Sequence, residues 1–242
     1  MSLDLENSII SFSFMKEEYA KYLLDKTKQD YNLIAEQFSN TRQRPWPEIE
    51  FLFKDISGND KILDIGCGNG RFFPFFRGKY LGIDNSERLL ELARKKFPKA
   101  NFQKADALNL PFNNESFDKI YSIAVLHHIP SKELRLRFLR EAKRVLKPNG
   151  FLILTVWKLA NKKELHSFIK FTILKALKLT KLDFKDILEP WGKKILRYYH
   201  WFSKKELKGL AEIAGFAIKE IGVVKNERGN RQNFYLIARK PS

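Results

Sequence analysis

The sequence predicts an α/β protein built on a doubly wound, mostly parallel sheet of seven strands. Three observations carry this prediction. A short apolar run ends in a glycine-rich turn at residues 61–71, and strand-like runs then alternate with helix-like segments up to residue 157. Two further strand-like runs, joined by a short loop, close the chain. Such alternation is typical of parallel sheets with helices on both faces.

The first strand and the glycine turn organise the rest of the chain. Lys61–Ile65 has strand character and is followed by Gly66, Gly68 and Gly70. Glycine tolerates positive φ and has no Cβ, so a ligand can lie directly against the backbone of such a turn. The next residues, RFFPFF, are expected to begin a helix. A strand, a glycine turn and a helix make the first half of a nucleotide-binding βαβ unit.

The second strand predicts an acid that binds ribose. It ends at Asp84, 20 residues after Asp64, and Ser86 is expected to cap the helix that follows. An acid at this position accepts hydrogen bonds from both ribose hydroxyls, and its charge disfavours a phosphate on the ribose. The alternative is a glycine turn beside an ordinary surface aspartate.

A third strand over residues 100–105 places Asp106 at its carboxyl end. There the carboxylate can accept from the exocyclic amine of adenine, while Ala107 and Leu108 line the ring. A turn or helix-capping aspartate is the alternative.

The fourth strand, FDKIYSIAVL, runs directly into HHIP at the carboxyl edge of the sheet, where open α/β folds hold their ligands. A basic amphipathic helix over residues 131–146 follows, with Ser131 as its N-cap and KPNG as its stop. The apolar run FLILTVW is then a fifth, buried strand.

Two regions flank this core. Residues 1–58 are predicted to be a helical arm or lid, because segments 17–24 and 31–38 have apolar residues at helical spacing. The rest of the chain, residues 59–242, is predicted to form a single domain, with a basic insertion at about 158–202.

A tryptophan stands between two prolines at the end of the arm. Pro45 and Pro47 exclude a continuous helix around Trp46. Arg42 and Arg44 beside it could pair with an anion while the ring stacks on a base or on adenine. The alternative is a packed tryptophan with solvated arginines.

The insertion is predicted to be helical, with an apolar stripe that packs on the domain and a lysine face that lies along a phosphate backbone. A helix lying on a membrane surface has the same pattern. The insertion closes with EPWGKKILRYYHWF, and a final helix runs from the capping box Ser203–Glu206 to Gly215. The predicted stripe consists of Leu165, Phe168, Ile169, Ile173, Ala176 and Leu177.

Charge indicates a polyanionic partner. Lysine and arginine number 45 against 28 acids, which gives a formal net charge of +17. Such an imbalance repels itself, so it favours nucleic acid first and an anionic membrane surface second. Solvated lysines without a partner are the alternative.

Composition excludes several classes of protein. With 44% hydrophobic and 30% charged residues, the chain is neither disordered nor embedded in a membrane. We expect no membrane span and no signal peptide, since the start contains Asp4 and Glu6. The single cysteine, Cys67, cannot form an internal disulfide, so a reducing, cytoplasmic location is expected. Four histidines and one cysteine show no metal-ligand spacing, so no metal is expected.

The motif D-x-G-x-G-x-G at residues 64–70 resembles motif I of the class I S-adenosylmethionine-dependent methyltransferases. The motifs T-R-x-x-P-W-P, A-V-L-H-H, R-Y-Y-H-x-F and a terminal N-F then follow in order. From about Tyr31 to Arg239 the chain is therefore similar to the tRNA wobble-uridine carboxymethyl methyltransferases, including the methyltransferase domain of AlkB-type oxygenase fusions. It departs from that family in its short basic insertion and in Phe234, where the family usually has tryptophan.

The resemblance implies that 5-carboxymethyluridine at the anticodon wobble position becomes its methyl ester, with S-adenosylmethionine as donor. It also implies an antiparallel strand in the closing hairpin, tRNA as partner, and a small zinc-ribbon activator that pairs with the edge strand near Asn101–Lys104. The expected cofactor-binding residues are Arg44, Trp46, Asp64, Gly66, Cys67, Gly68, Gly70, Asp84, Asn85, Asp106, Ala107, Leu108, Ile123 and Ala124.

The reaction needs a cationic clamp rather than a base. A carboxylate with a pKa of about 4 is already ionised at neutral pH, so the two histidines of HHIP are expected to position it, with one of them facing the substrate. Tight pairing would raise the barrier, because the carboxylate loses charge in the transition state. The expected substrate residues are Arg42, His127, His128, Arg197, Tyr199, His200 and Asn233, with Arg44 and Arg231 as further members of the clamp.

Two other functions share parts of this pattern. A small-molecule or quinone methyltransferase would also have motif I and the HH loop, and it could use the insertion at a membrane surface. A tRNA-binding scaffold without catalysis would keep the basic charge, although the intact glycines and acids of the cofactor site disfavour it.

Overall fold

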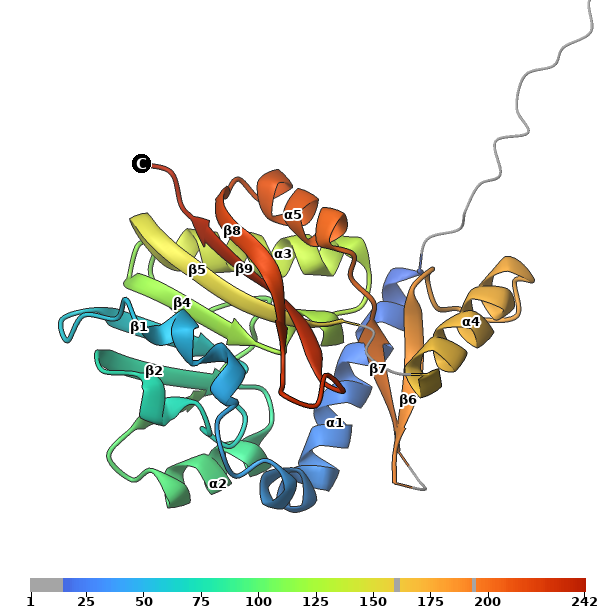
Figure 1. The fold of residues 1–242 in the computed structure, drawn as a ribbon, viewed down its shortest axis with the longest axis horizontal. Coiled ribbons are helices and arrows are strands. Elements are labelled where there is room, and N and C mark those ends of the chain that lie inside the picture. Colours follow the sequence, from blue (N-terminus) through green and yellow to red (C-terminus); the bar gives the residue numbers. More distant parts are fainter. Residues whose placement is uncertain (1–14, 159–161, 193–194) are drawn as a thin grey trace, which may run out of the picture.

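A seven-stranded sheet lies at the centre of the computed structural model, which describes residues 15–158, 162–192 and 195–242 (Figure 1). The strand order is β3-β2-β1-β4-β5-β9-β8. The first five strands are parallel, and β9 runs antiparallel to both β5 and β8, so the predicted sheet is confirmed. The strands are β1 Lys61–Ile65, β2 Lys79–Asp84, β3 Asn101–Lys104, β4 Phe117–Ile123, β5 Leu146–Lys158, β8 Ala217–Lys225 and β9 Gln232–Arg239.

Helices α3 (Lys132–Val145) and α5 (Lys204–Ile213) cover one face of the sheet (Figure 1). Ser131 and Ser203 cap them as predicted, each accepting a backbone N–H at 3.3 and 3.2 Å. The predicted stop at KPNG is wrong in one respect, because these residues are already part of β5. The other face is covered by α2 (Glu87–Lys96) and by the short 3-10 helix Pro47–Phe53, whose Phe53 packs in an aromatic cluster.

The first crossover differs from the prediction. RFFPFF does not begin an α-helix but forms the single 3-10 turn Phe73–Phe75. Pro74 lacks the N–H that a helix interior needs, and β2 begins at Lys79, which leaves no room for further turns. The phenylalanines instead pack against the sheet, where Phe76 lies 4.9 Å from Tyr121 between ring centroids.

The arm contains one long helix rather than two short segments. Helix α1 runs from Glu17 to Thr41 without a break. The polar stretch between the predicted segments remains helical, since Lys26 pairs with the buried Asp30 at 2.6 Å, one turn away. The first 14 residues of the predicted arm, including Asp4 and Glu6, lie outside the described residues.

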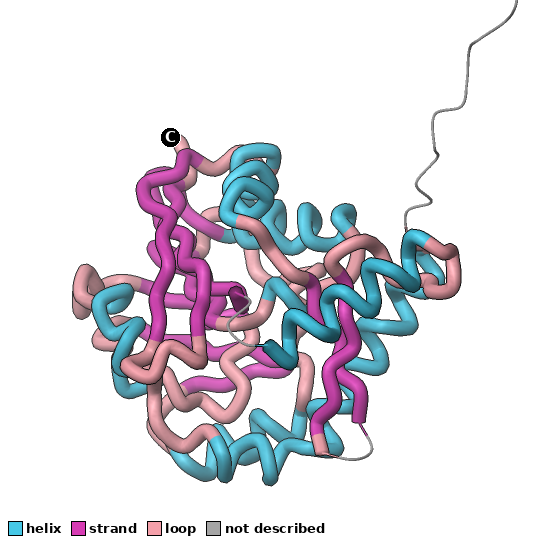
Figure 2. The backbone as a smooth tube through the Cα atoms, turned by 45° about the vertical axis from the view of Figure 1, so that its right-hand side comes forward, coloured by secondary structure: helices cyan, strands magenta, loops and turns pink. Residues whose placement is uncertain are grey.

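The insertion is only partly helical. Helix α4 (Lys162–Ala176) is followed by an antiparallel hairpin of β6 (Asp186–Trp191) and β7 (Ile195–His200), where the sequence pattern had predicted no strands. Helix α4 and this hairpin lie side by side, beside the main sheet (Figure 2).

The predicted packing of the α4 stripe is wrong for most of its members. Leu165, Ile169, Ile173 and Leu177 are 43%, 49%, 52% and 62% exposed. Their spacing of four places the first three on one exposed face of α4, with Leu177 just beyond the helix end. Phe168, also part of the predicted stripe, is half-buried, and its ring lies 5.6 Å from Trp201. No helix in the described part of the chain is long and apolar enough to cross a membrane.

Candidate active site

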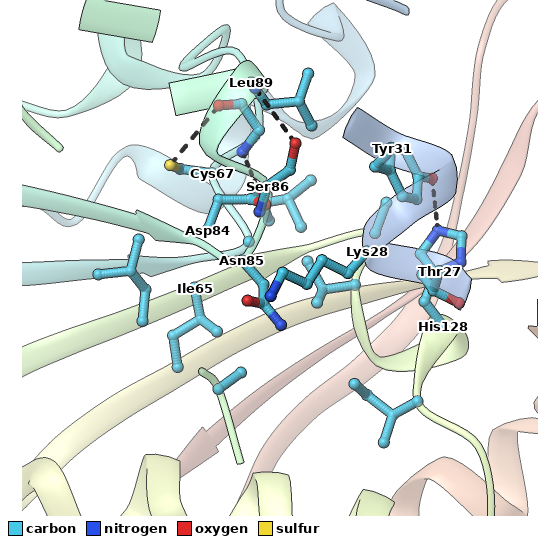
Figure 3. Close-up of a pocket in the computed structure, with 18 of the residues that line it drawn as sticks. Thr27, Lys28, Tyr31, Ile65, Cys67, Asp84, Asn85, Ser86, Leu89 and His128 are labelled. Atoms are coloured by element: carbon cyan, nitrogen blue, oxygen red, sulfur yellow. Dashed lines mark hydrogen bonds between the residues drawn. The ribbon is translucent and has the colours of Figure 1, made fainter. Parts of the chain in front are cut away.

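A cavity of about 180 Å³ opens at the carboxyl ends of β1, β2 and β4. The strand order reverses here, which is where open α/β sheets bind ligands. Cys67 and Asp84 lie on the sheet side of this cavity, and Lys28 and Tyr31 of α1 lie opposite them (Figure 3). Residues far apart in the sequence therefore form its two walls.

The glycine turn shapes the first wall. Gly66, Gly68 and Gly70 all have positive φ, at 75°, 57° and 71°. A Cβ at Gly66 would lie 2.4 Å from a methyl carbon of Val125, whereas one at Gly68 would meet nothing closer than 3.9 Å. Gly66 therefore allows the turn to pack, and Gly68 leaves bare backbone facing the cavity.

Asp84 is fixed by the turn and by the next helix. Its Oδ2 accepts the N–H of Gly68 and its Oδ1 accepts the N–H of Ser86, both at 2.8 Å. Burial raises the pKa of this carboxyl, and the backbone N–H groups counteract that rise. Each oxygen accepts only one of these bonds, so both keep a lone pair for a ligand.

The other two aspartates of the predicted cofactor site differ in position. Asp64 is buried beneath the turn, where it accepts the hydroxyl of Tyr80 at 3.0 Å, and burial raises its pKa to about 7. It does not line the cavity. Asp106 does, and it is exposed, with Oδ1 accepting the N–H of Leu108 at 2.9 Å.

The second wall is cationic. Arg42, Arg71 and Arg197 line the cavity, and no described carboxylate forms an ion pair with any of them. Arg42 and Arg197 instead lie over the ring of Trp191, at 4.7 and 4.4 Å from its centroid. Burial, with Arg42 nearby, lowers the pKa of the Arg71 guanidinium to about 9. Unpaired buried charges are costly, so this wall is arranged to receive an anion.

Hydrogen bonds fix the tautomers of both histidines. His128 Nδ1 lies 3.0 Å from the carbonyl of Tyr198, which can only accept, so Nδ1 carries the proton and Nε2 accepts the Tyr31 hydroxyl at 2.9 Å. His127 Nδ1 accepts the N–H of Trp157 at 3.3 Å, so its proton is on Nε2, which has no partner.

Both histidines are neutral at physiological pH. Burial lowers the pKa of His128 to about 3, and the charge of Arg197 adds to the effect. Burial and the neighbouring His128 lower the pKa of His127 well below its usual value. An imidazole with so low a pKa is a weak base, so these side chains can orient a ligand but are poorly suited to removing a proton.

The structure brings most of the predicted site residues to this cavity. On the cofactor side these include Gly66, Gly68 and Asp84, and on the substrate side Arg42, His127 and His128. The full predicted set in the cavity wall is Arg42, Trp46, Gly66, Cys67, Gly68, Asp84, Asn85, Asp106, Ala107, Leu108, Ile123, Ala124, His127, His128 and Arg197.

His200 is the clearest correction. It is 3% exposed, with its two ring nitrogens 2.7 Å from carboxylate oxygens of Asp186 and Glu206, and it does not reach the cavity. Successive side chains of a strand point to opposite faces, so β7 directs Arg197 toward the cavity and His200 away from it. Its buried contacts tie the hairpin to α5.

Other predicted residues also lie outside the cavity wall. Gly70 packs beneath the turn, where an added Cβ would lie 2.9 Å from Phe102. Tyr199 is 1% exposed and stacks under Trp157 at 4.6 Å. Asn233 is fully buried in β9, with neither amide atom hydrogen-bonded. Arg44 lies outside the cavity.

Trp46 is less available than expected. It lines the cavity but is only 7% exposed, and the guanidinium groups of Arg71 and Arg231 lie over its ring at 4.3 and 4.8 Å. Arg231 also pairs with Glu48 at 2.7 Å, so it is not a free member of the clamp. The tryptophan therefore supports arginines rather than presenting a face to a base.

Several cavity residues were missed from the sequence. In the sequence, Tyr31 belongs to an apolar helical pattern, Arg71 follows the glycine turn, and Trp157 ends a strand-like run. Lys28 carried no motif at all. The position of Trp157 at the carboxyl end of a central strand was the one usable signal, because ligands bind at that edge.

Comparisons with known proteins agree with this geometry. The family described as "Methyltransferase domain" matches residues 63–154. A solved S-adenosylmethionine-dependent methyltransferase from Methanosarcina mazei is 25% identical, with a TM-score of 0.68 over 82% of this chain and 99% of its own. The methyltransferase chain solved with the Haloferax volcanii Trm112 methyltransferase activator shares the fold, at 16% identity and a TM-score of 0.65 over 89% of this chain and 98% of its own. The protein is an S-adenosylmethionine-dependent methyltransferase of the class I fold.

Within this class of methyltransferases, the comparisons identify a smaller family. The Schizosaccharomyces pombe protein named tRNA (carboxymethyluridine(34)-5-O)-methyltransferase is 32% identical over 91% of this chain and 98% of its own length. The chain belongs to that family. Four further relatives that share this enzyme name align over 53% to 61% of this chain, which spans only 19% to 47% of their lengths.

Proposed function

We propose that the protein transfers a methyl group from S-adenosylmethionine to the carboxylate of 5-carboxymethyluridine at the wobble position of tRNA, forming the methyl ester. The observation that carries this proposal is the cationic wall. Arg42, Arg71 and Arg197 line the same cavity as the glycine turn, without carboxylate partners among the described residues. The names of the relatives give carboxymethyluridine as substrate, and its carboxylate is an anion that such a wall could bind.

The cofactor is assigned to the glycine-turn side. Asp84 is suited to the ribose hydroxyls, Asp106 to the adenine amine, and the bare backbone of Gly68 to close approach by the ligand. When bound there, S-adenosylmethionine supplies an activated methyl group on a sulfonium. The free lone pairs of Asp84 and the exposed carboxylate of Asp106 support this assignment.

The substrate carboxylate is assigned to Arg42 and Arg197. Both guanidiniums lie over aromatic rings, which orient them without neutralising them. The unsatisfied Nε2–H of His127 adds a neutral donor in the same wall. Trp157, half-buried and stacked on Tyr199 on one side, replaces Trp46 as the proposed surface for the uracil ring.

This arrangement orients an anion without a base. The carboxylate is ionised at neutral pH, so no proton has to be removed before it attacks. Its charge falls in the transition state, which favours a modest clamp over a bidentate ion pair. Tyr31 holds His128 through its own hydroxyl and accepts a long contact from Arg197 at 3.5 Å, so it positions both side chains.

Further assignments follow from the same proposal. Residues 1–58 would serve as a lid over the domain of residues 59–242, with Tyr31 and Arg42 at the lid's inner face. An activator subunit would pair with β3, whose outer edge is unpaired within the described sheet. The lysines of α4 would contact the tRNA body, and the protein would act in the cytoplasm.

The test is direct. Bulk tRNA from cells that lack this activity is incubated with the protein and labelled S-adenosylmethionine, with and without a co-expressed activator, and its nucleosides are separated by mass spectrometry. We expect label in 5-methoxycarbonylmethyluridine. Label in a quinone instead, when membrane lipids are offered in parallel, would favour the rival small-molecule methyltransferase.

A further inference from the structure

A second hollow adjoins the active-site cavity. Its volume is about 590 Å³, and four arginines line it: Arg42, Arg44, Arg71 and Arg231. No acidic side chain of the described chain contributes to its lining. Trp157 belongs to the walls of both spaces. We call this space the arginine hollow.

Two of these arginines are fixed beneath the hollow. Arg71 and Arg231 lie over the ring of Trp46 at 4.3 and 4.8 Å, and Arg231 is also held by Glu48 through Nε and Nη2 at 2.8 and 2.7 Å. Arg71 is only 7% exposed, and its Nη1 has no partner. A buried cation is less screened by salt than a surface one, so Arg71 strengthens the field at the floor.

The other two arginines are closer to solvent. Arg44 is exposed and makes no hydrogen bond or ion pair with another described residue. Arg42 stands where the hollow meets the cavity, and it lines both. A chain of positive charge therefore leads from the surface at Arg44 to the proposed carboxylate position.

This arrangement fits a phosphodiester better than a second carboxylate. A target nucleotide whose base enters the cavity carries a phosphate on each side of its ribose, so one phosphate must lie just outside the cavity. Guanidinium groups match phosphate oxygens in geometry and stay charged at all relevant pH values.

We propose that the arginine hollow binds the phosphodiester adjacent to the target nucleotide, with Arg44 as its outermost contact. This inference rests on the proposed methylation of tRNA. It removes Arg44 from the cofactor site, where the sequence had placed it, and it separates the recognition of the RNA backbone from the recognition of the base carboxylate.

The experiment measures binding of a fluorescent anticodon stem-loop that contains 5-carboxymethyluridine, over a range of salt concentrations. Arg44→Gln is compared with wild type and with Arg140→Gln, which removes an exposed arginine of α3 that lines neither space. We expect Arg44→Gln to bind about tenfold more weakly and its salt slope to fall by about 0.7, the value for one phosphate contact on a single strand. Calorimetry is expected to show unchanged affinity for S-adenosylmethionine.

Three results would overturn the inference: a wild-type salt slope in Arg44→Gln, an equal loss in Arg140→Gln, or weakened cofactor binding by Arg44→Gln. The last result would return Arg44 to the cofactor site. The proposed function is judged separately, by methylation of the same stem-loop by the wild-type protein. If the wild-type protein binds the RNA but does not methylate it, the proposed function is wrong. The comparison of salt slopes would still decide the role of Arg44.

Discussion

The two walls of the active-site cavity are built in opposite ways. On the glycine-turn side, Asp84 is fixed by backbone N–H groups of residues close to it in the fold, at 2.8 Å each. On the cationic side, Arg42 and Arg197 come from the end of α1 and from β7 of the insertion, and aromatic rings rather than acids hold them. One wall is complete without a ligand, whereas the other carries uncompensated charge.

This difference indicates how binding and chemistry are divided. A wall whose polar groups are already satisfied gives a preorganised site for a constant ligand. A wall with unpaired buried guanidiniums stores an electrostatic cost that an anionic ligand relieves. The following predictions test this contrast.

The largest effect is expected for Asp84→Ala. The change removes the proposed ribose acceptor and also frees the N–H groups of Gly68 and Ser86. We expect affinity for S-adenosylmethionine to fall by at least about 100-fold, because two charge-assisted hydrogen bonds are lost. Calorimetric titration measures this change.

Asp118→Ala is the matched control. Asp118 also accepts a backbone N–H, that of Lys61 at 2.9 Å, but it lies at the amino end of β4. Its removal is expected to leave cofactor affinity unchanged. Retention of cofactor binding by Asp84→Ala would disprove the assignment of this wall.

A change on the cationic wall is expected to separate transfer from cofactor binding. Arg197→Gln should lower kcat/KM for tRNA by about 100-fold, the loss expected for one charged contact, while calorimetric affinity for S-adenosylmethionine stays within about twofold. Arg197→Lys keeps the charge but not the planar guanidinium, so its kcat/KM should lie between the values of wild type and Arg197→Gln. A parallel loss of cofactor affinity would show that the walls are not distinct in function.

His200→Ala is expected to affect stability rather than transfer. The change leaves the buried Asp186 without one of its partners and opens a cavity under the hairpin. We expect about 3 kcal/mol less stability toward urea, with kcat within about twofold at temperatures where the variant is folded. His166→Ala, at an exposed position of α4, serves as the control. A selective loss of kcat would place His200 in the chemistry after all.

The pH dependence of stability is expected to follow from the neutral histidines. His128 has a pKa of about 3 in the folded protein, against about 6.5 when unfolded. Between these values the unfolded chain binds a proton that the native state does not, so stability falls as pH falls, by about 1.4 kcal/mol per pH unit. From pH 8.0 to 5.0 this amounts to about 2 kcal/mol.

Urea unfolding of wild type and His128→Asn at pH 5.0, 6.5 and 8.0 isolates this contribution, since other groups titrate in both proteins. Equal pH dependence of the two would contradict a depressed pKa. The same neutrality predicts that kcat/KM stays level from about pH 6 to 8, as expected where no base with a pKa in this range takes part.

The smallest effect is expected on α4. Lys170 of α4 and Lys178, two residues beyond the end of this helix, are exposed, and the proposed contact of this region is with the tRNA body. Replacing both with glutamine should weaken tRNA binding about fivefold and lower the salt slope by about 1.8, the value for two contacts on duplex RNA treated like B-form DNA. An unchanged slope in filter binding would exclude α4 from the RNA interface.

The glycine-turn wall could be predicted from the sequence because its rules are local. Positive φ at Gly68, an acid at the end of the second strand and a serine cap after it all depend on neighbouring residues, and each appears where expected. The parallel arrangement of the first five strands followed from the alternation of strand-like and helix-like segments. The 3-10 turn at Phe73–Phe75 differs from the βαβ pattern, which predicts a helix there, because Pro74 lacks the N–H that a helix interior needs.

The cationic wall could not be predicted to the same extent, because it depends on the missed hairpin. If this segment is not predicted to be a strand, the sequence suggests that Arg197, Tyr199 and His200 form one cluster. With it, the period of two along a strand sends Arg197 and His200 to opposite sides. The unexpected roles of Tyr31 and Arg71 arise from contacts between segments far apart in the chain, and a single sequence does not show which distant segments meet.

The side-chain amide of Asn69 joins the two walls. The side-chain nitrogen of Asn69, 1% exposed within the glycine turn, donates to Ser39 Oγ and to the carbonyl of Arg42, at 3.0 and 3.1 Å. The position of the turn and the position of the backbone that carries Arg42 are therefore linked, so that binding at one wall can affect binding at the other. Such coupling is reciprocal, so the donor should raise the enzyme's affinity for RNA by the same factor as RNA raises its affinity for the donor. Loss of the Asn69 amide should make the binding of the methyl donor and the binding of RNA independent of each other.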